Sequence, residues 1–105
     1  MSMSRRVTLA REHGERGHEA WALRLLGEIA AQGDPLDATQ AERHYREAGA
    51  LASELGMRPL QARCQLGLGR LRRDRAAVLG AVDLFRSMDM RVWLAEAERE
   101  LAGLA

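Results

Sequence analysis

The stretch Leu51–Gly56 (LASELG) decides the fold, because it restates the stretch Leu9–Gly14 (LAREHG) 42 residues earlier. The same offset carries Ala20 onto Ala62, Leu26 onto Leu68, and Gly27 onto Gly69. A fainter third copy follows 33 residues later, where Leu84, Met88, Met90, Arg91 and Ala95 fall on Leu51, Leu55, Met57, Arg58 and Ala62. A period in this range is typical of a helical solenoid, in which each hairpin buries its apolar face against its neighbours.

The composition favours one all-α domain and excludes several functional classes. The 105 residues are 47% hydrophobic but only 4% aromatic, so Ala and Leu must fill most of the core. A net charge of +1 gives no long-range attraction to nucleic acid or anionic lipid, and no apolar run is long enough to span a membrane. The single cysteine suits a reducing cytoplasm. Because repeat-like sequence reaches both ends, we expect residues 1–105 to be one domain cut from a larger protein.

Apolar spacing and capping residues predict about six helices. The expected spans are about Met3 to His13, His18 to Gln32, Asp37 to Leu55, Pro59 onward, Ala81 to Met88, and Leu94 to Leu104. Gly14, Gly33 and Gly56 are the expected helix stops, and Asp37 with Gln40 resembles a capping box.

The junction after the fourth predicted helix leaves two alternatives open. Residues 70–79 (RLRRDRAAVL) contain neither Gly nor Pro, and they are shorter than the matching part of the first hairpin. The chain either turns tightly near Arg73-Asp74 or continues as one helix from Pro59 to Met88. A fused helix would leave the face of Leu84, Phe85 and Met88 bare, and exchange of helices five and six would then give a swapped homodimer.

Three longer stretches carry a family resemblance. They are residues 16–30 (RGHEAWALRLLGEIA), 41–69 (AERHYREAGALASELGMRPLQARCQLGLG) and 95–101 (AEAEREL). With Ala41, Tyr45 and Ala48 at the expected helix contacts, the chain resembles the tetratricopeptide repeat (TPR). In particular it resembles the C-terminal repeats of large bacterial adenylate/guanylate cyclases with an ATPase module. The chain departs from this pattern at Arg72, where such repeats usually place a Tyr, and in its shortened second hairpin.

The resemblance implies a non-catalytic module for protein–protein interaction within a bacterial signalling protein. In such arrays the first helix of each hairpin lines a concave groove, which here implies the residues Trp21, Arg24, Glu28, Arg63, Leu66, Arg70 and Arg73. This set is net positive, so the expected ligand is an acidic or C-terminal peptide segment held by arginine forks. Two alternatives to peptide binding stay open. In the first, these arginines simply face the solvent, and in the second, the module serves self-association.

The other reactive residues do not form a recognisable site. His13, His18 and His44 lack the spacing and the companion ligands of a metal site. Cys64 has no marked base and is expected to be a buried thiol. Asp74 interrupts the arginine run 70–75, and no aromatic residue is interleaved for base stacking. We therefore expect no catalytic residue, no metal, no cofactor and no nucleic-acid partner.

Overall fold

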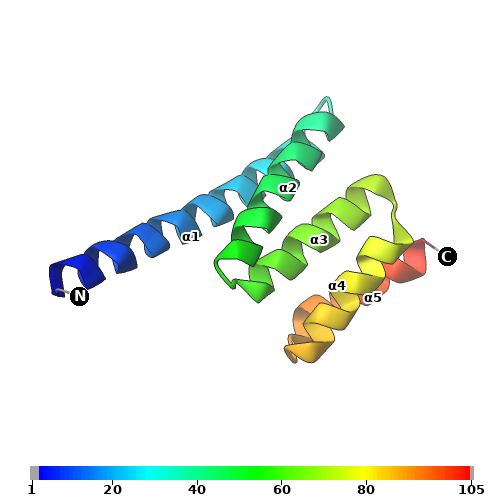
Figure 1. Cartoon of the computed structure of the whole chain (residues 1–105). Helices are drawn as coiled ribbons and strands as arrows, with labels where there is room; N and C mark the ends of the chain where they lie inside the picture. The colour runs from blue at the N-terminus through cyan, green and yellow to red at the C-terminus, as the bar shows by residue number, and fades with distance from the viewer. Residues whose placement is uncertain (1–2, 105) are drawn as a thin grey trace.

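The computed structural model describes residues 3–104, with the side chains of Glu12 and of residues 14–104. Five helices make up almost all of this range: α1 (Met3–Gln32), α2 (Ala38–Glu54), α3 (Arg58–Arg72), α4 (Arg75–Ser87) and α5 (Arg91–Gly103). The expected all-α class is confirmed, since residues 3–104 contain no strand. Each helix packs mainly on its neighbours in the chain, and α1 also touches α3 (Figure 1).

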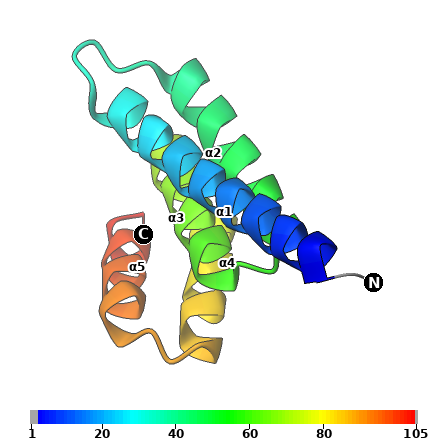
Figure 2. The same ribbon diagram turned by 90° about the vertical axis from the view of Figure 1, so that its left-hand side faces the viewer.

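The predicted helix stop at Gly14 is wrong, because the first two predicted helices form the single helix α1. Among the described side chains, a Cβ atom at Gly14 would meet nothing within 4 Å, so none of them draws the chain into a turn there. Just after Gly14, Arg16 pairs with Glu54 at 2.8 Å and Gly17 lies beside Met57. The N-terminal half of α1 therefore extends past the end of α2 (Figure 2).

The fused helix over residues 59–88 is also wrong, and the tight turn near Arg73-Asp74 is confirmed. Arg73 adopts a left-handed conformation with φ 54°. The Asp74 backbone N–H donates to the Gly69 carbonyl oxygen at 2.9 Å, which closes the end of α3. The Asp74 carboxylate then accepts the Ala77 backbone N–H at 3.3 Å and caps α4.

The same closing geometry ends α2, α3 and α4. Gly56, Arg73 and Asp89 are left-handed, with φ values of 72°, 54° and 53°. In each case the next residue donates its N–H to the carbonyl five positions back, at 2.8, 2.9 and 3.0 Å. These contacts form the Schellman motif, which satisfies carbonyls that a helix end leaves unpaired. Only one of the three turns uses glycine.

The helix α3 lies between the two halves of the core and contributes to both. One cluster of buried residues joins α1, α2 and α3, and consists of Ala20, Ala48, Ala52, Leu60 and Cys64. The other joins α3, α4 and α5, and consists of Ala62, Leu66, Val78, Ala81, Val82, Phe85 and Ala97. Because Phe85 is fully covered within one chain, the bare face that a fused helix would have left does not exist.

Two glycines make room for Tyr45, which α2 inserts between α1 and α3. A Cβ atom at Gly27 would lie 3.0 Å from the Tyr45 ring, and one at Gly67 only 2.6 Å from it. These small residues let a large ring fill the space between three helices. The tyrosine ring also lines a cavity beside Glu28 and Arg70.

The outer face of α1 differs from the expected packing. Leu26, which the repeat aligns with Leu68, is 44% exposed, and Leu25 and Ile29 are 55% and 60% exposed. Ala20 and Gly27 are the buried residues of this helix among its described side chains. The inner stripe of α1 is therefore narrower than its leucines indicate.

Candidate functional site

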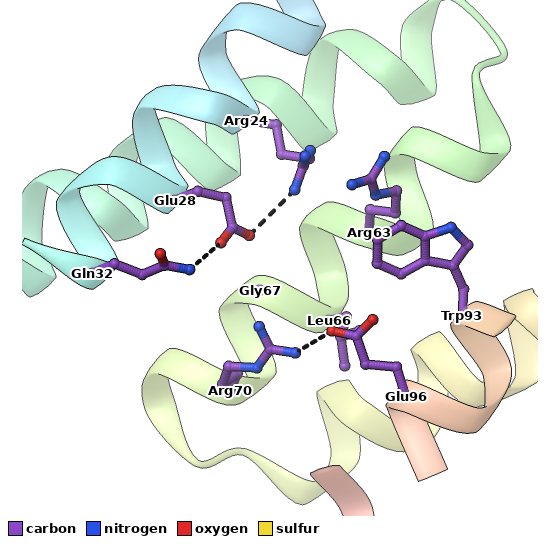
Figure 3. Close-up of a pocket in the computed structure, with 9 residues that line it drawn as sticks. All are labelled: Arg24, Glu28, Gln32, Arg63, Leu66, Gly67, Arg70, Trp93 and Glu96. Atoms are coloured by element: carbon purple, nitrogen blue, oxygen red, sulfur yellow. Dashed lines mark hydrogen bonds and ion pairs between the residues drawn. The ribbon is translucent and has the colours of Figure 1, made fainter. Parts of the chain in front are cut away.

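A cavity of about 230 Å³ opens between α1, α3 and α5 (Figure 3). It is lined by Arg24, Glu28, Gln32, Arg63, Leu66, Gly67, Arg70, Trp93 and Glu96. Five of the seven residues expected in the groove therefore line one cavity. Only α1, α3 and α5 contribute to it, while α2 and α4 lie outside.

The other two expected groove residues lie elsewhere. Trp21, on α1, is 39% exposed and does not line the cavity, but the guanidinium carbons of Arg24 and Arg63 lie 5.7 and 5.1 Å from its ring centroid. Arg73 is exposed in the turn between α3 and α4 and does not line the cavity. Its position there follows from the left-handed turn that ends α3.

Arg63 is the central cation of the cavity. Its guanidinium carbon lies 4.0 Å from the ring centroid of Trp93 and 5.1 Å from that of Trp21, so tryptophans from two helices contact it. Its Nε atom is buried without a hydrogen-bond partner among the described side chains. Burial, and next the positive charge of Arg24, lower the pKa of Arg63, although a guanidinium stays protonated at neutral pH.

Arg24 is only partly neutralised. Its Nη1 atom lies 3.2 Å from Glu28 Oε1, while its buried Nε atom has no hydrogen-bond partner in the part of the chain whose side chains are described. The second oxygen of Glu28 accepts a hydrogen bond from Gln32 at 3.2 Å. Arg24, Glu28 and Gln32 thus form a row of polar side chains on one face of α1, along the edge of the cavity (Figure 3).

Arg70, in contrast, pairs with two carboxylates of the protein itself. It donates to Glu96 at 2.9 Å and to Glu100 at 2.8 Å, both on α5. Desolvation disfavours its charge, but the two carboxylates outweigh this effect and raise the pKa of Arg70. The open positive charge of the cavity is therefore concentrated on Arg63 and Arg24.

The side chains from α5 were not expected in the groove. Trp93 stacks on Phe85, with ring centroids 6.2 Å apart, and presents another face to Arg63. The repeat contains a signal that could have placed Glu96 in the groove. The 33-residue offset that aligns Arg91 with Arg58 also aligns Glu96 with Arg63. For Trp93 no comparable signal exists, because the same offset aligns it with the core residue Leu60.

The remaining reactive groups do not gather into a second site. Cys64 is buried in the core, and burial raises the pKa of its thiol to about 11, so it is a poor nucleophile. Within residues whose side chains are described, no three His, Cys, Asp or Glu residues cluster as metal ligands; the side chain of His13 lies outside that set. None of the described helices combines the length and the apolar character needed to cross a bilayer.

The arrangement of charged and aromatic side chains in the cavity suits an anionic group. A cation held between tryptophans, beside a second partly paired arginine, attracts and orients an anionic group. Comparison with protein-family models, with curated proteins and with solved structures finds no match for this chain.

Proposed function

We propose that this chain is a non-catalytic TPR-type module that binds an acidic or C-terminal segment of a protein partner in the cavity between α1, α3 and α5. We place it, by its sequence resemblance, within a bacterial signalling protein. The observation that carries the proposal is Arg63, a cation that contacts two tryptophans and has no ion-pair partner among the described side chains. A carboxylate that enters the cavity supplies the missing partner.

The helices that line the cavity support the same proposal. Two of the three helices that line the cavity, α1 and α3, carry the residues that the resemblance assigns to a concave face. Arg70 keeps α5 against α3 through Glu96 and Glu100, and so holds Trp93 in position beside Arg63. The site is therefore largely formed before any ligand arrives, which lowers the entropy lost on binding.

The test uses the protein's own fluorescence, because its only two tryptophans both contact Arg63. Peptides that carry two or three acidic residues are titrated, with lysine-substituted peptides as the charge control. Arg63→Met removes the charge but keeps an aliphatic side chain between the rings. We expect it to weaken binding by about tenfold or more, since a charge-assisted contact contributes about 1.5–3 kcal/mol.

Arg99→Met is the matched control, because Arg99 is exposed on α5 and does not line the cavity. It should bind acidic peptides as the wild-type protein does. Equal affinity of Arg63→Met and wild type for every acidic peptide would exclude the cavity as the binding site.

Self-association is the second candidate function, and the outer face of α1 favours it. Leu25, Leu26 and Ile29 are exposed together on this face, and apolar side chains that gather in this way often mark interfaces. Light scattering over a range of concentrations tests this function. A dimer that dissociates in the Leu25→Glu/Ile29→Glu variant would support it, and a wild type that stays monomeric would exclude it.

A further inference from the structure

The charged cavity continues into a second, more apolar one. This second cavity has a volume of about 210 Å³ and shares Glu28, Gln32, Gly67 and Arg70 with the first. Beyond the shared part it is lined by Ala31, Leu36, Leu71 and the buried ring of Tyr45. Leu36 is 55% exposed in the connection between α1 and α2, so an apolar side chain borders this end of the groove.

The charged and apolar ends lie in the same order along both walls. On α1, Arg24 precedes Glu28 and Gln32, and on α3, Arg63 precedes Gly67 and Arg70, so the two series run side by side (Figure 3). From Arg63 to Leu71 the helix advances about 12 Å, at a rise of about 1.5 Å per residue. The middle of the groove is polar, and its cation Arg70 already pairs with Glu96 and Glu100.

We propose that the groove recognises a short extended segment with a carboxylate and an apolar side chain three to four residues apart. The carboxylate pairs with Arg63, and the apolar side chain fills the recess of Leu36, Leu71 and Tyr45. An extended chain advances about 3.3 Å per residue, so three to four residues span the ~12 Å between the two ends. This inference rests on the proposed function and adds the spacing that the ligand must have.

The probe is a synthetic peptide with capped ends, with one Glu and one Leu three positions apart in a Ser/Gly background, prepared in both orders. One comparison peptide places Glu and Leu side by side, and another replaces Leu with Ser. We expect the spaced peptide, in its better order, to bind about tenfold more tightly than either comparison peptide, since the recess buries most of one leucine side chain.

Protein variants separate the two ends of the groove. Leu36→Ser should remove the preference for the spaced peptide, while Leu79→Ser, at an exposed leucine of α4, should keep it. Arg63→Met should weaken the binding of every one of these peptides, because each carries the glutamate. If Arg63→Met weakens them but the spaced and adjacent peptides bind equally, the spacing is wrong and the proposed function stands. If Arg63→Met weakens none of them, or no peptide binds the wild type, both fail.

Discussion

The stretch from Gly14 to Gly17 stays helical although it begins and ends with glycine, whereas the chain turns sharply at Arg73-Asp74, where it has no glycine. The difference lies in what surrounds each stretch. A Cβ atom at Gly14 would meet nothing within 4 Å, while one at Gly69, just before the turn, would lie 2.6 Å from Val78. Close packing of α4 on α3 therefore requires the turn. Glycine lowers the free energy of a left-handed residue, but it does not by itself end a helix.

The largest effect is expected where a glycine provides space inside a helix. Gly67→Ala places a Cβ atom 2.6 Å from the buried Tyr45 ring, so the ring or α3 must shift. We expect the variant to be less stable by about 1–3 kcal/mol in denaturant unfolding, although alanine favours the helix. The matched control is Gly49→Ala, whose new methyl would lie at an ordinary 3.5 Å from Cys64. A Gly67→Ala variant as stable as wild type would show that Tyr45 does not wedge the helices.

The second effect concerns the turn itself. Asp74→Ala removes the carboxylate that accepts the Ala77 N–H, and we expect a loss of about 1 kcal/mol in the free energy of unfolding. Asp83→Ala is the control, because this exposed residue of α4 makes only a 3.8 Å pair with Arg86. The mass in solution should not change. A dimeric Asp74→Ala protein would mean that the cap, rather than the packing of α4 on α3, prevents the two helices from joining into one.

The third prediction uses the continuous part of α1. Gly14→Ala should stabilise the protein by up to about 1 kcal/mol and increase its helical circular dichroism, because the residue is helical and the methyl group meets no neighbour. Gly56→Ala, at a φ of 72°, should instead lower stability by about 1 kcal/mol. Loss of stability in both variants would place a left-handed turn at Gly14 and restore the six-helix arrangement.

The smallest effect is a dependence on pH beside the turn. Arg72, the last residue of α3, hydrogen-bonds to Glu42 of α2, and with Arg46 it holds the pKa of that carboxyl below its ordinary value of 4.5. A lowered folded pKa adds stability that is fully present above the unfolded pKa and disappears as the pH falls through the folded value. The difference in melting temperature between wild type and Glu42→Gln should therefore be constant near neutral pH and shrink below about pH 4. A difference that does not change over this range would contradict the role of this ion pair.

Parts of the groove follow from the repeat, and parts do not. The spacing of Arg24 and Glu28 on one helix, and of Arg63, Leu66 and Arg70 on another, places each set on one side of its helix. The sequence does not reveal that Arg70 is already occupied, because its partners Glu96 and Glu100 are 26 and 30 residues away. Nor does it reveal that Trp93 reaches Arg63, since this contact depends on how α5 packs against Phe85.

The sequence by itself determines the helical class, the buried face of α2 and the local caps. Ala41, Tyr45 and Ala48 are all buried, as expected of helix contacts, and Asp37 accepts the Gln40 N–H at 3.0 Å. These features depend on neighbours within about one helical turn. The tertiary structure alone decides that α1 passes through Gly14, that the chain turns at Arg73 without a glycine, and that a cavity forms between α1, α3 and α5. Each of these depends on distant side chains that either fill the space beside a helix or leave it open, and no local pattern contains that information.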